Sequence, residues 1–173
     1  MKNNFVKKIF ICATEQSGDN IGKNILEKLI VYYPSLIVDG VGGSEMKPYM
    51  RNQYYSLTDF KSMGIVEILF SIKKYIKIIN ILSKLIISKN YNLIITIDSP
   101  DFNYPLSKKI RNYGYNGKII QVVAPTVWAW RKYRAKKFAK IFDEIFTLFK
   151  FENKFFEKFS LNVTCIGHPI YYI

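Results

Sequence analysis

The stretch Leu93-Ile94-Ile95-Thr96-Ile97-Asp98-Ser99-Pro100-Asp101 carries the clearest signal for the fold of this 173-residue chain. Its first five residues, four of them apolar, are typical of a strand, and the run stops abruptly at Asp98. Because apolar and polar residues do not alternate, we expect a strand buried on both faces, as in a parallel sheet covered by helices. Ligands of such sheets bind outside the carboxyl ends of the strands, so Asp98 is expected to face a cleft.

The same pattern recurs along the chain. Short apolar runs predict strands, and the amphipathic segments between them predict helices. The alternation favours an α/β fold with a Rossmann-like, doubly wound, mostly parallel sheet in a single domain over residues 1–173. We expect strands at residues 8–14, 36–41, 92–98, 118–124, 144–149 and 162–166, and helices at residues 20–33, 65–88, 104–113, 131–142 and 151–159.

The composition narrows the class of protein. A hydrophobic content of 49% suits a globular core and not a disordered or collagen-like chain. The net charge of +13 favours anionic partners, namely nucleic acid, anionic lipid or phosphorylated substrates. An AT-rich coding sequence would produce a similar excess of lysine. No motif for binding DNA or RNA appears, so we expect no nucleic-acid partner.

Histidine and cysteine give no sign of a metal site. The sequence has one histidine and two cysteines, and Cys12 and Cys165 lie in separate apolar runs. This pattern predicts reduced, buried thiols in a cytosolic protein and no zinc. No signal peptide is visible at the start of the sequence.

Two loops that follow predicted strands carry candidate site residues. In Glu15-Gln16-Ser17-Gly18-Asp19, Gly18 permits a tight turn. Ser17 or Asp19 either caps the next helix or faces a phosphate or sugar at its amino terminus. In the second loop, Asp98 is placed to accept a proton from a substrate hydroxyl as a general base. Asp101 is either a second site residue or the cap of the helix that follows.

Two further motifs come later in the chain. Val127-Trp128-Ala129-Trp130-Arg131 holds both tryptophans, whose faces suit sugar rings or acyl chains unless they pack in the core. Arg131 could pair with a phosphate. His168 follows the last predicted strand and is either a site residue or a structural hydrogen-bonding group.

The segment from residue 63 to residue 86 has a wider apolar surface than one core-facing stripe needs. Charged residues interrupt it repeatedly, so it does not predict a spanning helix. The excess of apolar surface beside lysines favours a helix that packs on the sheet and also lies in a membrane interface. The interrupting residues are Glu67, Lys73, Lys74, Lys77 and Lys84.

Together these motifs resemble those of the lipid-A-disaccharide synthase family of inverting glycosyltransferases. They occur in the family's order and at near-family spacing, although Thr14 stands where the family usually has a glycine. The matching pieces are Glu15-x-Ser17-Gly18-Asp19, Met63-Gly64-Ile65-Val66-Glu67, Ile97-Asp98-x-Pro100-Asp101-Phe102-Asn103, Val127-Trp128-Ala129-Trp130-Arg131 and Gly167-His168-Pro169.

The resemblance implies a GT-B architecture of two Rossmann-like domains. The chain would be the N-terminal, acceptor-side domain, and a C-terminal donor-binding domain, absent here, would be its partner. The implied reaction transfers 2,3-diacylglucosamine from its UDP derivative to 2,3-diacylglucosamine 1-phosphate (lipid X). The products are a β-1,6 disaccharide phosphate and UDP, and neither metal nor other cofactor is expected.

The resemblance also assigns residues. Asp98 would be the general base, and the implied place of the protein is the cytoplasmic face of the bacterial inner membrane, as a peripheral enzyme on anionic lipids. Residues implied to bind substrate are Glu15, Ser17, Gly18, Asp19, Asp101, Asn103, Trp128, Arg131 and His168, and residues implied to contact the membrane are Val66, Ile68, Leu69, Ile72 and Ile76.

Two alternatives remain at this stage. One is a remnant of the family without enzymatic activity that still binds membranes. The other is a soluble UDP-sugar enzyme with the GT-B fold, such as an epimerase. The apolar segment from residue 63 to residue 86 argues against the second, because soluble sugars do not require a lipid-facing helix.

Overall fold

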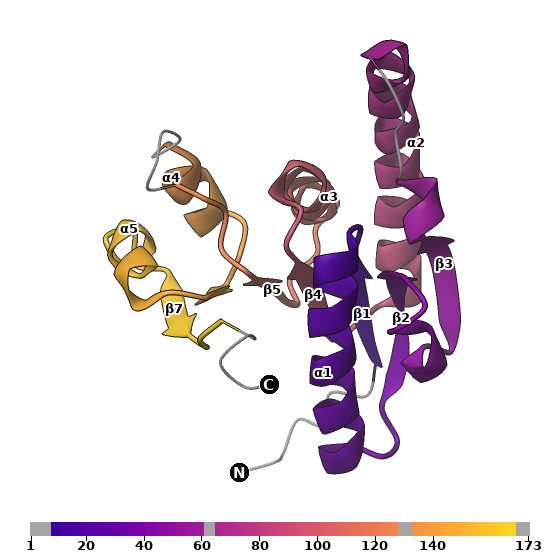
Figure 1. Ribbon diagram of the computed structural model, residues 1–173, viewed down its shortest axis with the longest axis horizontal. Helices are drawn as coiled ribbons and strands as arrows, with labels where there is room; N and C mark the ends of the chain where they lie inside the picture. The colour runs from indigo at the N-terminus through magenta and orange to yellow at the C-terminus, as the bar shows by residue number, and fades with distance from the viewer. Residues whose placement is uncertain (1–7, 61–64, 128–132, 169–173) are drawn as a thin grey trace.

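The fold is a single parallel sheet of seven strands in the order β3-β2-β1-β4-β5-β6-β7 (Figure 1). A computed structural model describes residues 8–60, 65–127 and 133–168, with the backbone alone for residues 65–71. Every neighbouring pair of strands is parallel, which confirms the predicted Rossmann-like α/β fold. The strands are β1 (Lys8–Ala13), β2 (Ile37–Gly42), β3 (Asn52–Ser56), β4 (Leu93–Ile97), β5 (Lys118–Val122), β6 (Glu144–Thr147) and β7 (Asn162–Cys165).

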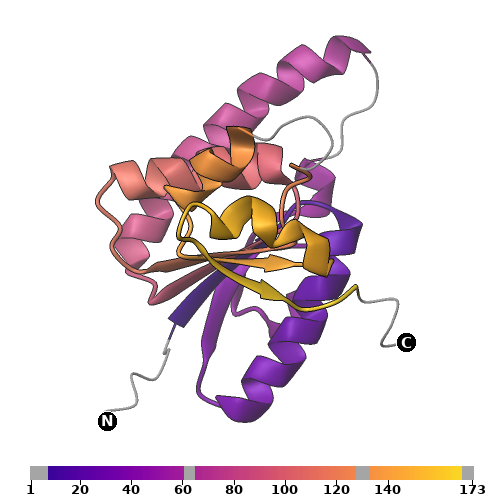
Figure 2. The ribbon, with the colours of Figure 1, turned by 90° about the vertical axis from the view of Figure 1, so that its left-hand side faces the viewer.

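Helices cover the two faces of the sheet unequally. Figure 2 shows the sheet between two layers, with α1 on one side and α2, α3, α4 and α5 on the other. Leu26 of α1 packs against Ile9 and Ile11 of β1, whereas Leu82 of α2 and Leu106 of α3 belong to the core on the opposite face. The helices are α1 (Gln16–Tyr32), α2 (Ile65–Lys89), α3 (Pro100–Asn112), α4 (Tyr133–Ala139) and α5 (Lys154–Glu157), with short 3-10 helices η1 (Lys47–Tyr49), η2 (Leu57–Asp59) and η3 (Lys150–Glu152).

Several local features differ from the sequence-based expectations, and α4 and α5 end two to three residues earlier than expected. Strand β3 was not predicted, because its sequence Asn-Gln-Tyr-Tyr-Ser has no apolar run. It lies at the edge of the sheet beside β2, and its side chains are at least partly exposed. Helix α3 begins at Pro100 and not near residue 104, since a proline suits the first helical position. Helix α1 begins at Gln16, four residues before the predicted start.

The direction of the chain across the sheet reverses between β1 and β4. From β1 the chain moves through β2 to β3, and from β4 it moves the other way through β5 to β7. The loops that follow β1 and β4 therefore lead to opposite faces. The place where they separate, called the crevice below, is the usual ligand site of open α/β sheets. Ala13 pairs with Ile97, so Glu15 and Asp98 emerge close together at this crevice.

The amino-terminal part of α2 extends beyond the rest of the molecule (Figures 1 and 2). Because α2 connects two parallel strands, it begins at the edge where the strands have their carboxyl ends. Its projecting part therefore lies on the same side of the molecule as the crevice. Within the described residues, no helix combines the length and apolar character that crossing a membrane requires.

Candidate functional site

Asp98 occupies an unusual backbone conformation directly after β4. Its φ is 52°, and the next residue, Ser99, has a φ of 42°. Two consecutive non-glycine residues in the left-handed region cost energy, and such strain concentrates at functional sites. Helix α3 begins at the following residue, Pro100, so these two residues form the whole turn from strand to helix.

Buried polar side chains hold this turn in place. The N–H of Asp98 donates to the carbonyl of Val122 at 2.9 Å. The carbonyl of Asp98 accepts from Asn103 Nδ2 at 2.8 Å and from Gln121 Nε2 at 3.0 Å. Thr96 Oγ1 in turn donates to Gln121 Oε1 at 2.6 Å. Because Asn103, Gln121 and Thr96 are all buried, the peptide on both sides of Asp98 is fixed.

Gln121 and Thr96 were not predicted as site residues. A signal for them existed in the sequence, since each is a polar residue inside an otherwise apolar strand. A buried polar side chain needs a hydrogen-bonding partner, and here the partners are the backbone of the turn and each other. Asn103, predicted to bind substrate, also holds the turn in the structure, because it donates to the carbonyls of Ile97 and Asp98.

Two hydrogen bonds connect the loops after β1 and β4. Ser17 Oγ donates to Asp98 Oδ2 at 3.2 Å, and Ser99 Oγ donates to Glu15 Oε1 at 2.8 Å. Asp98 is half-buried, whereas Glu15 and Ser17 are exposed. The alternative that Ser17 caps α1 is therefore wrong, since its hydroxyl turns to Asp98 and the helix has no side-chain cap. A partly exposed carboxylate held in this way can accept a proton from a hydroxyl in the crevice.

Asp19 and Gly18 shape the first loop from inside. The carboxylate of Asp19 is fully buried and accepts the backbone N–H groups of Gly43, Glu45 and Met46 at 2.7–3.2 Å. It thus fastens the loop after β2 and does not cap α1. A side chain on Gly18 would place its Cβ only 3.1 Å from that of Ala13, so glycine allows α1 to approach β1 closely. Direct contact of either residue with a substrate stays a prediction.

Asp101 pairs with a side chain from another helix. Its Oδ1 lies 2.6 Å from Nη2 of Arg134 in α4, and no side-chain bond caps α3. The alternative that Asp101 is the cap is therefore wrong. The pair borders a hollow of about 230 Å³ between α3 and α4, lined by Pro100, Asp101, Tyr104, Pro105, Tyr133, Arg134, Lys137 and Phe138.

A second hollow, of about 350 Å³, lies on the other side of the crevice, at the ends of β2 and β3. Five of its eight lining residues carry a side-chain hydroxyl or amide group, and such groups can bind the hydroxyls of a sugar. Each hollow begins beside the loops that hold Asp98, since Gln16 lies next to Ser17 and Pro100 lies next to Ser99. The second hollow is lined by Gln16, Gly43, Ser44, Lys47, Gln53, Ser56, Leu57 and Thr58.

The remaining predicted substrate contacts lie elsewhere in the chain. His168 follows β7, three strands from β4, which corresponds to roughly 14 Å along the sheet. It is partly buried, and its ring stacks on Phe149 with 5.8 Å between ring centroids. The structure therefore does not bring His168 next to Asp98. Trp128 and Arg131 lie outside the described residues.

The predicted membrane-contacting residues lie on α2. Ile72 and Ile76 are 51% and 54% exposed, one helical turn apart, and Lys73, Lys74 and Lys77 beside them are exposed. The side chains of Val66, Ile68 and Leu69 are outside the described residues. The described part of the projecting end thus combines exposed isoleucines with lysines.

The described residues offer few groups for binding metal. Among them, no group of three or more His, Cys, Asp or Glu side chains comes together in a way that could hold a metal ion. Cys12 is fully buried, and burial raises the pKa of its thiol far above the ordinary value. Cys165 is only partly buried, which differs from the expectation of two buried thiols.

A family model and two curated relatives that match this chain carry the same family description. The family model for lipid-A-disaccharide synthetase matches residues 9–172. The chain is 38% identical over 161 residues to the lipid-A-disaccharide synthase of Chlamydia muridarum and covers 26% of that protein's length. It is 39% identical over 166 residues to the lipid-A-disaccharide synthase of Rickettsia typhi and covers 43% of it. The chain therefore spans less than half the length of these relatives.

Two solved structures share the fold at low identity. One is described as a "putative UDP-N-acetylglucosamine 2-epimerase" from Listeria monocytogenes, with a TM-score of 0.60 and 10% identity over 89% of this chain and 42% of that one. The other is Anabaena HepE in complex with UDP and glucose, with a TM-score of 0.50 and 9% identity over 93% of this chain and 44% of that one. At these identities, the likeness concerns the fold alone.

Proposed function

This chain belongs to the lipid-A-disaccharide synthetase family, and we propose that it is the acceptor-side, N-terminal domain of a GT-B hexosyltransferase that makes the lipid A disaccharide. The donor is UDP-2,3-diacylglucosamine, and the acceptor is 2,3-diacylglucosamine 1-phosphate. A C-terminal domain that binds the donor completes the enzyme. The observation that carries the proposal is the turn after β4. Its backbone is strained, Asn103 and Gln121 hold it in place, and it presents Asp98 at the crevice between β1 and β4.

In the proposed reaction, Asp98 is the general base. The 6-hydroxyl oxygen of the acceptor forms a bond to the anomeric carbon of the donor sugar, and the bond from that carbon to UDP breaks. The proton of the hydroxyl passes to the carboxylate of Asp98, and UDP leaves with the electron pair. Attack from the face opposite UDP gives the β-1,6 disaccharide phosphate.

Neighbouring side chains position Asp98 for this step. The hydroxyl of Ser17 donates to Oδ2 of Asp98, which fixes the orientation of the carboxylate. Asn103 and Gln121 fix its backbone carbonyl. A fixed carboxylate loses little entropy when the hydroxyl arrives, which is the advantage of preorganisation in catalysis. Of these residues, only Asp98 needs to touch the reacting atoms.

The projecting end of α2 would bring the domain to its acylated substrates. Its exposed isoleucines enter the interface of a bilayer, and its lysines attract anionic headgroups. We propose that the enzyme works in the cytoplasm, peripheral on the inner face of the inner membrane, and the exposed isoleucines and lysines of α2 support contact with a membrane. Because the projecting end and the crevice lie on the same side of the molecule, a bound membrane would deliver acyl-chain substrates close to Asp98.

A transfer assay tests the enzymatic proposal. The chain is incubated with both lipid substrates, alone and together with the C-terminal part of the Rickettsia typhi relative, and the disaccharide phosphate is measured by mass spectrometry. We expect product only when both parts are present, and none with the Asp98→Ala chain. Glu157→Gln, an exposed carboxylate change in α5, serves as the control and should retain activity.

The outcomes separate the candidates. Undiminished turnover with Asp98→Ala would remove Asp98 as the base. If no product forms with or without the C-terminal part, while the wild-type chain still binds liposomes, a membrane-binding remnant is favoured. Transfer to a non-acylated acceptor as fast as to the acylated one would favour a soluble UDP-sugar enzyme.

Liposome binding tests the membrane face. Ile72→Glu combined with Ile76→Glu should reduce binding to vesicles that contain anionic lipid by about tenfold or more. Ile81→Glu is the matched control, because Ile81 is 44% exposed but lies half a helical turn around α2 from Ile72. Equal binding of the double variant and the control would show that the membrane face lies elsewhere.

A further inference from the structure

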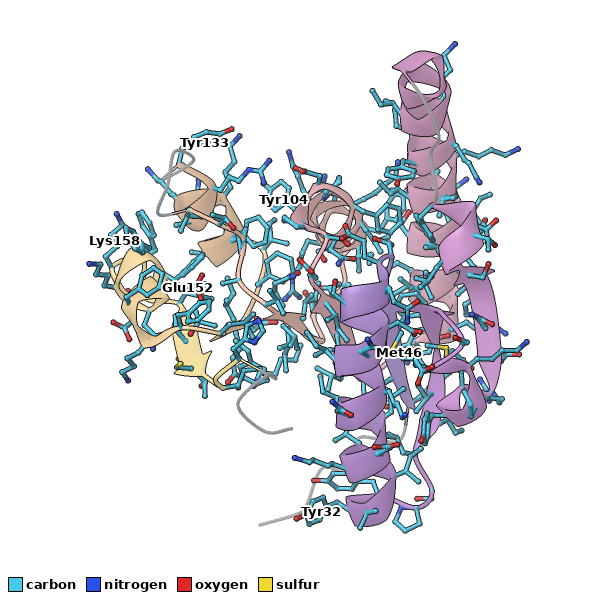
Figure 3. All side chains as sticks on the ribbon, viewed as in Figure 1. Tyr32, Met46, Tyr104, Tyr133, Glu152 and Lys158 are labelled. Carbon is cyan, nitrogen blue, oxygen red and sulfur yellow. The ribbon has the colours of Figure 1, made fainter. Side chains whose placement is uncertain are left out.

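The hollow between α3 and α4 has a composition that suits an anionic ligand. Its walls carry two cations, Arg134 and Lys137, and one carboxylate, Asp101. Figure 3 shows Tyr133 at the start of α4 and Tyr104 on the side of α3 that faces α4. The rings of Tyr104 and Phe138 stack with 5.1 Å between their centroids, which gives the hollow a rigid aromatic wall.

Arg134 and Asp101 differ in exposure. The side chain of Arg134 is only 17% exposed, whereas that of Asp101 is 79% exposed. A mostly buried guanidinium needs an anionic partner, and an exposed carboxylate is a partner that a stronger anion can replace at small cost. A guanidinium presents five N–H donors in a plane, and this geometry matches the oxygens of a phosphate.

The hollow lies close to the proposed base. Pro100 and Asp101 line it, and they follow Asp98 and Ser99 directly in the chain. A ligand whose hydroxyl reached Asp98 could therefore extend an anionic group into the hollow. The sequence alone does not distinguish Arg134 from the neighbouring basic residues Lys132, Lys136 and Lys137.

We propose that this hollow is the subsite for the phosphate monoester of the acceptor, with Arg134 and Lys137 as its binding residues. The inference rests on the proposed function, because it assigns a place to the 1-phosphate of that acceptor. Asp101 holds Arg134 in position when the subsite is empty and gives way to the phosphate on binding. The enzyme thereby selects a phosphorylated acceptor and orients its 6-hydroxyl toward Asp98.

Calorimetric titration of the 173-residue chain tests the subsite. The probes are 2,3-diacylglucosamine 1-phosphate and the same lipid without its phosphate, each dispersed in micelles of a non-ionic detergent. We expect the wild-type chain to bind the phosphorylated lipid about 10- to 100-fold more tightly than the other. Arg134→Gln should remove most of this preference, and Lys137→Gln should reduce it about three- to tenfold. Lys136→Gln, an exposed neighbour that does not line the hollow, should leave the preference unchanged.

A variant with the opposite expected effect guards against a general loss of structure. Asp101→Asn removes the carboxylate that competes for Arg134, so it should tighten binding of the phosphorylated lipid several-fold. A gain in affinity cannot result from unfolding. It would support the subsite even if Arg134→Gln failed to fold.

Other outcomes would overturn the subsite. Equal binding of the two lipids by the wild-type chain would do so, and so would a full preference retained in folded Arg134→Gln. Either result would leave the acceptor-side assignment of the domain intact. Binding of neither lipid by the wild-type chain would contradict that assignment itself, and the subsite with it.

Discussion

Two aspartates of the same sheet have opposite environments. Asp39 in β2 is fully buried, and its carboxylate accepts hydrogen bonds from Arg51, Asn52 and Tyr91 at 2.7–3.1 Å. Asp98 is half-buried at the end of β4, and its carboxylate accepts from Ser17. The fold saturates one carboxylate with donors inside the sheet and presents the other at the crevice. The difference separates a carboxylate that stabilises the fold from one that can accept a proton from a substrate.

The environment of Asp39 also determines its charge. Burial alone raises the pKa of this carboxyl, but hydrogen bonds from Arg51, Tyr91 and Asn52 outweigh burial and hold the pKa below its ordinary value of 3.8. Tyr91, buried beside it, has its pKa raised well above the ordinary value, chiefly by burial and then by hydrogen bonds with Tyr54 and Asp39. Asp39 is therefore charged and Tyr91 neutral at physiological pH.

The largest effect that the comparison predicts is on turnover. In the enzyme completed by its C-terminal domain, Asp98→Asn should lower kcat about 10²- to 10⁴-fold, because an amide cannot accept the proton. Asparagine tolerates the left-handed conformation, so the free energy of unfolding should change by less than about 0.5 kcal/mol. Steady-state kinetics measures kcat, and urea denaturation measures the free energy of unfolding. A large loss of stability with normal kcat would reverse the roles of the two aspartates.

The next effect is on stability. Asp39→Ala should lower the free energy of unfolding by about 3 kcal/mol, because the hydroxyl of Tyr91 and the guanidinium of Arg51 lose their anionic partner. Urea denaturation at neutral pH measures it. Glu45→Ala is the control, since its ion pair with Lys23 lies in solvent and should contribute far less to stability than the contacts of Asp39. Equal losses in the two variants would contradict a special role for Asp39.

These two residues also show how far the sequence alone could go. The abrupt end of an apolar run predicted that Asp98 would lie at the carboxyl edge of a parallel sheet, and the structure confirms that position. The partners of Asp98 could not be predicted, because Ser17 is 81 residues away and meets it only through the pairing of β1 with β4. The pair of Asp101 with Arg134 depends in the same way on the packing of α3 beside α4. Strand β3 was missed because an edge strand needs no apolar run.

A smaller effect concerns pH. Because the pKa of Asp39 is lower in the folded chain than in the unfolded chain, its contribution to stability is fully present above the unfolded value of about 3.9 and is lost as the pH falls through the folded value. Wild-type stability should therefore fall below about pH 4 more steeply than that of Asp39→Asn, which has no carboxyl to protonate. Urea denaturation from pH 7 to pH 3 provides the comparison. If the free energies of unfolding of the two proteins fell equally with pH, protonation of Asp39 would not be the cause of the loss of stability in acid.

The smallest effect tests whether Asp98 depends on its neighbour. Ser17→Ala removes the hydroxyl that donates to Oδ2 of Asp98, a hydrogen bond that contributes about 1 kcal/mol. We expect kcat of the completed enzyme to fall about three- to tenfold, with little change in KM or in stability, because Ser17 is exposed and acts by orienting the base. Ser17→Thr keeps the hydroxyl and should restore most of the loss. If Ser17→Ala raised KM and left kcat unchanged, the hydroxyl would be binding the substrate, and Asp98 would not need it for orientation.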